Sequence, residues 1–126
     1  MNILYIVTSG DNGGAQKYVS LLASHFHGSV ASGIENTFLA AECKKGELSY
    51  HPLPSLVRRI HIMKDIRAIY EIYSLIKKLH PDIVHVNSTK AGVLGSIASK
   101  LAGAKVVYTV HGFILQEKNG SIRKAL

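Results

Sequence analysis

The stretch that decides the fold is Pro81–Phe113, with the sequence PDIVHVNSTKAGVLGSIASKLAGAKVVYTVHGF. It contains two short apolar runs, Ile83–Val86 and Val106–Val110, which are rich in β-branched residues. Polar or turn residues bound each run, as is typical of strands buried in a parallel sheet. The sequence therefore predicts two neighbouring parallel strands here.

A helical pattern, Ala91–Ala102, lies between the two runs. Ser88 and Thr89 are polar residues of the kind that start a helix, and Gly103 is a typical stop signal. The residues expected to face the core are Leu94, Ile97, Ala98 and Leu101. Together the segments predict a strand–helix–strand unit, and such crossovers are almost always right-handed.

Both predicted strands are followed by small or polar residues that can take part in chemistry. Asn87 and Ser88 follow the first strand, and His111 and Gly112 follow the second. Ligands of open α/β sheets bind just beyond the carboxyl ends of the strands. We therefore expect the two loops to lie at the same edge of the sheet.

The N-terminus also shows a strand followed by a helix. Ile3–Val7 is an apolar run, Thr8–Gly14 (TSGDNGG) is a glycine-rich loop, and Ala15–Phe26 has apolar residues at helical spacing. Backbone N–H groups at such a helix start favour an anion, and glycines let a phosphate approach closely. The loop matches neither the P-loop pattern nor G-x-G-x-x-G, so a plain tight turn stays open as the alternative.

The middle of the chain is predicted to hold a second strand, an extended segment and a long helix. We interpret His27–Gly33 as a connection, Asn36–Ala41 as the second strand and Tyr50–Leu56 as extended chain with room for a short strand. The helical pattern Ile62–Leu79 ends before Pro81. Its core-facing residues are predicted to be Ile62, Ile66, Ile69, Tyr73 and Ile76, widened by Ile72, Leu75 and Leu79, and Tyr70 is assigned to the core as well.

This alternation of strands and helices predicts an α/β fold, a Rossmann-like, doubly wound and mostly parallel sheet. At 126 residues the chain is expected to form one domain with a single substantial core.

Composition narrows the choice of partners and excludes several kinds of site. Fifteen Lys and Arg against eight Asp and Glu give a formal net charge of +7, which favours anionic partners. Basic residues between Arg58 and Lys78 fit either a solvated helix face or an anionic surface contact. The single Cys43 excludes an internal disulfide, and the histidines show no metal-ligand spacing. No apolar run is long enough to span a membrane and no signal-peptide pattern occurs, so we expect a cytoplasmic chain.

Three pieces of the sequence together resemble the N-terminal domain of a GT-B glycosyltransferase of glycosyltransferase family 4. The first is the opening strand followed by TSGDNGGAQKYVSLLA. The second is Ser55–Phe113, which begins SLVRRIHIMKDIRAIYEIY, and the third is the closing VHGF within it. The resemblance extends over nearly the whole chain and is closest to the polysaccharide-assembly members.

The resemblance implies transfer of a sugar, with retention at the anomeric carbon, from a nucleotide-sugar to a lipid-linked or oligosaccharide acceptor. The family uses two Rossmann-like domains and needs neither a metal nor another cofactor. The N-terminal domain shapes the acceptor side, and the C-terminal domain holds the nucleotide and carries an E-x7-E motif. This sequence has no E-x7-E motif and no second domain. We therefore expect an incomplete acceptor-side domain, inactive by itself.

The resemblance also implies residues for the donor side. Gly13 and Gly14 match the loop that approaches the donor phosphates. His111, the expected catalytic residue, matches a histidine that ends a strand and lines the donor sugar, and Gly112 is expected to contact substrate. A strand-end histidine bonded to the backbone is the alternative interpretation of His111.

Four residues match a loop near the acceptor: His85, Asn87, Ser88 and Lys90. For Ser88 a helix N-cap is an equally good interpretation. His85 fits a buried, hydrogen-bonded histidine as well.

Three functions stay open on the sequence alone. The first is an enzyme fragment of polysaccharide assembly, the second a truncated, non-catalytic binding module, and the third a generic Rossmann-like nucleotide or phosphate binder. A reading frame that continues past Leu126 favours the first over the second, and the lack of G-x-G-x-x-G disfavours the third. Expected partners are the nucleotide-sugar, the acceptor and an anionic membrane surface bound peripherally from the cytoplasmic side, but not nucleic acid. We also expect a homo-oligomer, because Lys105–Val110 is predicted to be an apolar edge strand.

Overall fold

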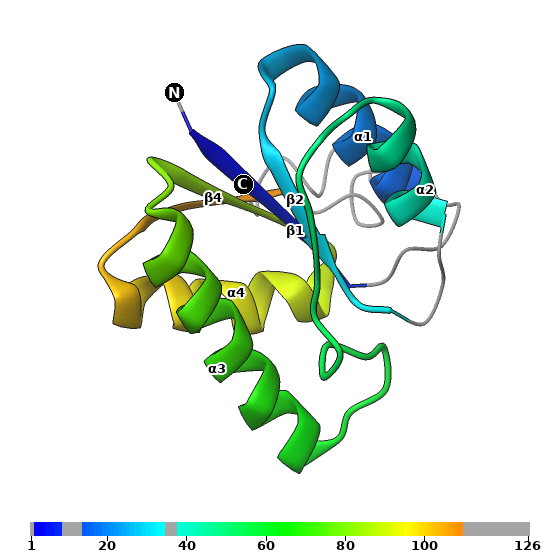
Figure 1. Cartoon of the computed structure of the whole chain (residues 1–126). Helices are drawn as coiled ribbons and strands as arrows, with labels where there is room; N and C mark the ends of the chain where they lie inside the picture. Colours follow the sequence, from blue (N-terminus) through cyan, green and yellow to red (C-terminus); the bar gives the residue numbers. More distant parts are fainter. Residues whose placement is uncertain (1, 9–13, 35–37, 110–126) are drawn as a thin grey trace, which may run out of the picture.

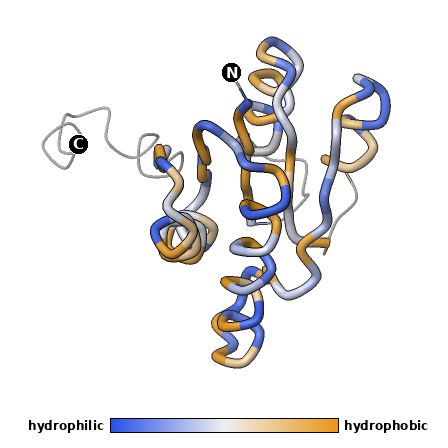
Figure 2. The backbone as a smooth tube through the Cα atoms, turned by 60° about the vertical axis from the view of Figure 1, so that its left-hand side comes forward, coloured by the Kyte–Doolittle hydropathy of each residue, from blue (hydrophilic) through white to orange (hydrophobic). Residues whose placement is uncertain are grey.

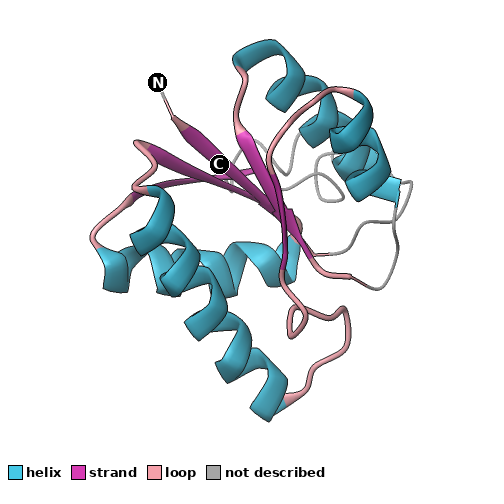
Figure 3. Cartoon of the chain, viewed as in Figure 1, coloured by secondary structure: helices cyan, strands magenta, loops and turns pink. Residues whose placement is uncertain are grey.

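The computed structural model describes residues 2–8, 14–34 and 38–109, which form a sheet flanked by helices (Figure 1). Its strands are β1 (Ile3–Val7), β2 (Ser29–Ser32), β3 (Tyr50–Pro52), β4 (Ile83–Asn87) and β5 (Lys105–Thr109). Its helices are α1 (Gly14–Phe26), α2 (Phe38–Lys45), α3 (Ile62–Leu79) and α4 (Thr89–Ala102). Figure 3 shows strands and helices alternating along the described chain. β1 and α3 have the predicted bounds, and β4, α4 and β5 differ from prediction by one or two residues.

The sheet has the strand order β3-β2-β1-β4-β5, and all its described strands run parallel. β1 lies at the centre, so that Tyr5 is opposite Val30 of β2 on one side and opposite His85 of β4 on the other. The predicted doubly wound α/β fold is therefore confirmed, with a sheet that is all-parallel within the described residues.

The helices divide between the two faces of the sheet and build two cores (Figure 1). On one face, α3 and α4 pack against Leu4 and Ile6 of β1. On the other face, α1 and α2 pack against Tyr5 and Val7. Successive side chains of a strand point to opposite faces, so β1 contributes to both cores in turn.

Two glycines let α4 approach the sheet closely. A Cβ atom added at Gly95 would lie 2.6 Å from Cγ1 of Val86, and one added at Gly92 would lie 2.2 Å from Cζ of Tyr108. Carbon atoms at these separations overlap, so any larger residue would displace its neighbour. The close packing sets the start of α4 beside the carboxyl ends of the strands.

The second strand lies earlier in the chain than predicted. β2 is formed by Ser29–Ser32, which the sequence analysis assigned to a connection. The predicted strand Asn36–Ala41 instead overlaps α2, where it is described. Leu39 and Cys43, one helical turn apart, are both buried in the core shared with α1. That spacing favours a helix, whereas the sequence SVAS of β2 offers only two apolar residues.

The predicted core-facing residues of α3 and α4 are wrong in part. Ile62, Ile66 and Tyr70 on α3, and Ile97 and Leu101 on α4, are exposed. The buried residues are Ala68, Ile72, Leu75 and Ile76 on α3, and Ala91, Gly92, Leu94, Gly95, Ala98 and Ser99 on α4. The first turns of α3 extend past the sheet (Figure 1). α4 packs through Leu94 and several small residues, whereas its large residues Ile97 and Leu101 are exposed.

Candidate functional site

The carboxyl edge of the sheet has a topological switch point between β1 and β4. From β1 the chain moves outward to β2 and β3, and from β4 it moves in the opposite direction to β5. The loops after β1 and β4 therefore lead to helices on opposite faces, and such a junction leaves a crevice where ligands bind. Thr8 and Ser88 are the first residues after these two strands.

Thr8 and Ser88 join the two strand ends through their hydroxyl groups. The Thr8 N–H donates to Ser88 Oγ at 3.2 Å, and the two hydroxyl oxygens lie 2.5 Å apart. Thr8 Oγ1 also accepts the backbone N–H of Ala91, in the first turn of α4, at 3.1 Å. One threonine at the end of β1 thus holds β4 and the start of α4 together.

Ser88 occupies the N-cap position of α4, but its side chain does not cap the helix. Its φ of 75° and ψ of 159° lie in a region that residues other than glycine rarely adopt. The Ser88 hydroxyl turns to Thr8, and the Thr8 hydroxyl caps the helix in its place. The N-cap interpretation is therefore right for the position of Ser88 and wrong for the capping atom.

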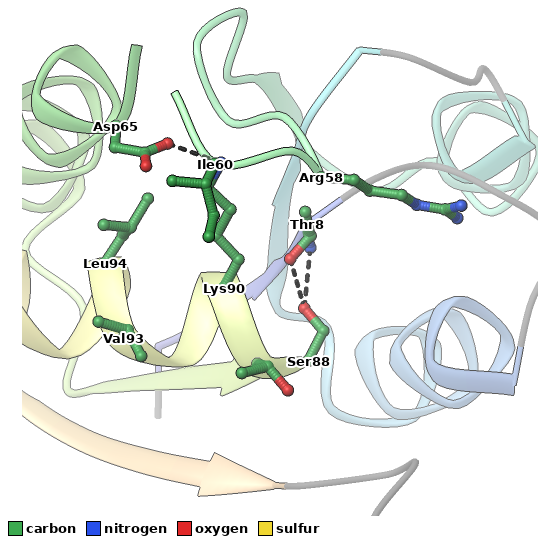
Figure 4. Close-up of a pocket in the computed structure, with 9 residues that line it drawn as sticks. Thr8, Arg58, Ile60, Asp65, Ser88, Lys90, Val93 and Leu94 are labelled. Carbon is green, nitrogen blue, oxygen red and sulfur yellow. Dashed lines mark hydrogen bonds and ion pairs between the residues drawn. The ribbon is translucent and has the colours of Figure 1, made fainter. Parts of the chain in front are cut away.

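A pocket of about 590 Å³ opens beside this junction, between α4 and the segment that leads into α3 (Figure 4). In Figure 4 the hydroxyl groups of Thr8 and Ser88 lie on one side, and Val93 and Leu94 lie further along α4. The lining residues are Thr8, Arg58, Ile60, Asp65, Ser88, Thr89, Lys90, Val93 and Leu94. The pocket thus offers hydroxyl groups, charged groups and an apolar wall to a ligand with polar and apolar parts.

Lys90 reaches across the pocket to the start of α3 (Figure 4). Its Nζ lies 2.6 Å from Asp65 Oδ1, and it also donates to the backbone carbonyl of Arg59. Both side chains are largely buried, so salt screens this pair less than a surface pair. His61 caps the same helix start, because its Nδ1 accepts the Lys64 N–H at 3.1 Å. The ion pair therefore fixes the capped end of α3 to α4.

His85 and Asn87 do not join this pocket. His85 faces α1, and its ring centroid lies 6.4 Å from that of Tyr18 in this helix. Its Nε2 lies 2.7 Å from Thr109 Oγ1 of β5, and its ring centroid lies 5.3 Å from that of Tyr5 in β1. Asn87 is fully buried, and its Nδ2 donates to the carbonyls of Ile6 and His85. Of the four residues assigned to the acceptor loop, the structure brings only Ser88 and Lys90 to the pocket. Substrate contacts of all four stay predictions.

The residues assigned to the donor side lie mostly outside the described residues. This holds for Gly13, His111 and Gly112. Gly14 is the first residue of α1, as a loop-to-helix turn requires. The roles of these residues toward phosphate and sugar stay predictions.

Sequence reasoning missed Thr8 and Asp65 as parts of the site. Each has a signal in the sequence: Thr8 is the first polar residue after a buried strand, and Asp65 lies in the first turn of a helix, where an acid is favoured. Neither signal identifies the interaction partner, because Thr8 hydrogen-bonds a residue 80 positions away and Asp65 forms an ion pair with a residue of another helix.

Cys43 does not provide a nucleophile. It is buried, and this burial, together with the nearby Glu42 charge, raises the pKa of its thiol to about 11. Such a thiol stays protonated near neutral pH. Over residues 2–8, 14–34 and 38–109, no group of three or more His, Cys, Asp or Glu side chains could hold a metal ion, and no helix is long and apolar enough to cross a membrane.

A curated relative matches about half of the chain. It is the UDP-Gal:alpha-D-GlcNAc-diphosphoundecaprenol alpha-1,3-galactosyltransferase of Escherichia coli, 48% identical over 65 residues. The matched stretch is 51% of this chain and 17% of that enzyme. The similarity is close where it occurs, and it covers a small part of the relative.

Solved structures share the fold at low sequence identity. The lipopolysaccharide outer core galactosyltransferase WaaB has a TM-score of 0.69 and 18% identity, over 87% of this chain and 32% of that one. The UDP-GlcNAc 2-epimerase of Neisseria meningitidis, bound to UDP-GlcNAc, has a TM-score of 0.65 and 14% identity, over 86% of this chain and 31% of that one. These similarities show the fold alone, because a transferase and an epimerase share it.

A family profile described as glycosyl transferase 4-like matches residues 3–126. The match extends from β1 through the segment Pro81–Phe113 that decided the fold. It agrees with the resemblance found in the sequence motifs. The chain belongs to the glycosyl transferase 4-like family.

Proposed function

We propose that this chain is the acceptor-side domain of a glycosyltransferase that moves a sugar from a nucleotide-sugar to a lipid-linked precursor of a polysaccharide. The family match over residues 3–126 supports sugar transfer. The Escherichia coli relative is named for a UDP-linked donor and a lipid diphosphate acceptor, which supports this choice of substrates. In the proposal, a separate domain holds the nucleotide.

The observation that carries the proposal is the pocket at the switch point between β1 and β4. Thr8 and Ser88 use one of their two O–H groups to bond each other, and the second O–H is left to donate to a sugar or a phosphate. Lys90 is paired with Asp65, so the net positive charge of the lining comes from Arg58, and Ile60 and Val93 add apolar surface. A lipid diphosphate sugar has matching parts, namely hydroxyl groups, negative charge and a hydrocarbon chain.

The donor side of the proposal depends on residues carried over from the family resemblance. Gly13 and Gly14 would present backbone N–H groups at the start of α1, where the diphosphate leaving group gains charge. His111 would hydrogen-bond a hydroxyl group of the donor sugar, with Gly112 beside it. The nucleotide-sugar acts as a substrate, and the proposal includes no cofactor.

A short-chain lipid diphosphate that carries N-acetylglucosamine tests the acceptor site. Titrated into the isotope-labelled chain, it should shift the amide signals of Thr8, Ser88 and Lys90, with an affinity of about millimolar at best. Val93→Glu places a carboxylate in the pocket wall and should weaken binding about tenfold by repelling the diphosphate.

Ile97→Glu is the matched control, because Ile97 is exposed one turn further along the same helix and does not line the pocket. It should bind the analogue as the unchanged chain does. Equal weakening by both variants, or pocket signals that stay still, would refute the acceptor site.

The proposal assigns the nucleotide to a separate domain, so residues 1–126 alone should show no sugar transfer. Incubation with a panel of nucleotide-sugars and a lipid-linked acceptor should give no product. Product that disappears with His111→Ala would contradict this expectation.

A second copy of the chain is a further proposed partner. β5 lies at the edge of the described sheet, where Val106, Val107 and Tyr108 are exposed. Unpaired backbone groups on an apolar edge strand favour pairing with another chain. Light scattering should report a dimer or larger assembly at micromolar concentration, and Val107→Lys should reduce it while circular dichroism shows an intact fold. A monomer at high concentration would count against this partner.

The place of action is proposed to be the cytoplasmic face of an anionic membrane, bound peripherally. The acceptor's lipid and the net charge of +7 both favour it.

A further inference from the structure

Two hydroxyl groups are in a position to cap the start of α4. A serine directly before a helix ordinarily accepts the N–H of the third helical residue, which in α4 is Ala91. Ser88 stands at that place and does not make this bond. The Ala91 N–H instead donates to Thr8 Oγ1 at 3.1 Å. The helix is therefore capped from another strand, by a residue far away in the sequence.

Thr8 is fixed on several sides. It is buried at the end of β1, whose sequence is ILYIV, and the strand that follows the N-terminus is largely orange in Figure 2. Its N–H donates to Ser88 Oγ at 3.2 Å, and its carbonyl accepts the Gly33 N–H at 2.9 Å. A Cβ atom added at Gly33 would lie 2.2 Å from this carbonyl oxygen and 2.1 Å from that of Leu56. Packing of this kind leaves the Thr8 backbone no room to shift.

Ser88 is held in a strained backbone conformation. An ordinary N-cap residue has a negative φ, whereas Ser88 has a φ of 75° and a ψ of 159°. Such a conformation persists only where the surrounding structure enforces it. Asn87, which precedes it, is fully buried and lies opposite Val7 of β1. The Ser88 carbonyl accepts the Gly92 N–H at 2.8 Å. The sheet and the helix thus hold the Ser88 backbone, and Thr8 holds its side chain.

The two hydroxyl groups together leave one donor for a ligand. Each hydroxyl group has one O–H and two lone pairs. The N–H groups of Thr8 and Ala91 occupy one lone pair each, and the bond between the hydroxyls occupies another lone pair and one O–H. The other O–H has no partner among the described residues, whichever way the shared bond points. Both side chains line the pocket, so this O–H suits an acceptor oxygen of a bound ligand (Figure 4).

We propose that Thr8 is a positioning residue of the pocket. By capping α4 in place of Ser88, it holds Ser88 in the strained conformation and keeps the remaining O–H at the pocket, ready for a phosphate or sugar oxygen. The inference rests on the proposed function for the identity of that ligand. It goes further by giving the strain at Ser88 a role, because a donor fixed before binding does not have to be ordered by the ligand.

The exchange of caps is tested first without a ligand. Thr8→Val removes the hydroxyl and keeps the shape, so Ser88 should relax and cap Ala91 itself. The Cα and Cβ chemical shifts of Ser88 should then move to values typical of a negative φ. Exchange of the Ala91 amide should stay slow in Thr8→Val and become about tenfold faster when Ser88→Ala is added. Unchanged Ser88 shifts, or fast Ala91 exchange already in Thr8→Val, would overturn the proposal.

The strain is tested by two substitutions that both remove the Ser88 hydroxyl. Ser88→Gly tolerates a positive φ and Ser88→Ala does not, so the glycine variant should have the higher urea midpoint. The difference should shrink when Thr8→Val is also present, because the backbone has then relaxed. A difference of the same size in both backgrounds would show that Thr8 does not hold the strain.

The role in binding is tested with the short-chain lipid diphosphate that carries N-acetylglucosamine. Thr8→Val and Ser88→Ala should each weaken its binding about tenfold, and the double variant should weaken it no further, because each change removes the same donor. Thr8→Ser restores the hydroxyl and should recover most of the affinity. Ser24→Ala removes an exposed hydroxyl of α1, on the other face of the sheet, and should bind as the unchanged chain does. Circular dichroism checks that all variants fold.

The proposal and the proposed function fail in different ways. Losses of affinity that add in the double variant would overturn the proposal, because the two hydroxyls would then bind the ligand separately, and the proposed function would stand. An unchanged chain that does not bind the analogue would refute the proposed function. The Ser88 chemical shifts and the urea midpoints then decide by themselves whether Thr8 holds Ser88.

Discussion

The two ends of helix α3 carry similar side chains in opposite surroundings. Toward the C-terminus, Ile72 and Ile76 are buried against the sheet. Toward the N-terminus, Ile62 and Ile66 have the same chemistry and are exposed. An 18-residue helix is about 27 Å long. The five-residue strand β4 spans about 17 Å. The helix is therefore longer than the sheet it covers, and only the end that lies over the sheet is core.

Truncating one isoleucine at each end gives the largest expected contrast. Ile72→Ala should lower the free energy of unfolding by about 2–5 kcal/mol, because it leaves a cavity in the core. Ile66→Ala should change it by no more than about 0.5 kcal/mol, because that side chain packs against little in the fold. Urea denaturation followed by circular dichroism measures both. Equal losses of unfolding free energy would mean that the N-terminal end of α3 is packed as tightly as the C-terminal end.

Glu71, in the middle of α3, accepts the Ser55 N–H at 3.1 Å and the Ser55 hydroxyl at 2.9 Å. Weakening these two hydrogen bonds should have an intermediate effect on stability. Glu71→Gln keeps the size of the side chain and replaces a charge-assisted pair of hydrogen bonds, so it should lower the unfolding free energy by about 1–2 kcal/mol. Amide exchange at Leu56 and Val57 should become faster. Glu42→Gln removes a surface ion pair with Lys45 and should cost less than about 1 kcal/mol. A Glu71 variant as stable as the Glu42 control would show that the hydrogen bonds from Ser55 to Glu71 do not stabilise the segment around Leu56 and Val57.

Local sequence patterns predicted most of the fold. They failed where a pattern was short, as in β2, or where an apolar stripe extends beyond the sheet, as at the start of α3. β1 and α3 were predicted to the residue because each has a continuous apolar pattern of one period. β2 was missed because two apolar residues carry too little signal. The exposure of Ile62 could have been predicted, since the lengths of α3 and of the strands are both visible in the sequence. It required a comparison of two elements instead of a pattern within one.

The candidate site could be predicted only as a location. The polar residues after the strands placed it at the carboxyl edge, and Ser88 and Lys90 do lie there. The contacts that build it join distant parts of the chain, such as Thr8 with Ser88 and Lys90 with Asp65. No local period encodes such pairs, because they depend on how α4 packs on the sheet.

Substitution of His51 should have the smallest effect on stability, and it concerns the packed, C-terminal half of α3. It lies on β3 in a hollow lined also by Glu71, Leu75 and Lys78 of α3. Its Nε2 has no hydrogen-bond partner among the described residues. Burial lowers the pKa of His51 below its usual 6.5, and the charge of Lys78 lowers it further.

The folded protein therefore favours the neutral imidazole, and acid should weaken the fold through this residue. The contribution of His51 to stability is fully present above pH 6.5 and is lost as the pH falls through the lower folded-state pKa. His51→Gln does not titrate, so its unfolding free energy should depend less on pH between about 7 and about 5. His25→Gln, on the exposed surface of α1, should keep the full dependence. Equal pH dependence in the two variants, measured by urea denaturation, would show that His51 is not the source of the acid sensitivity.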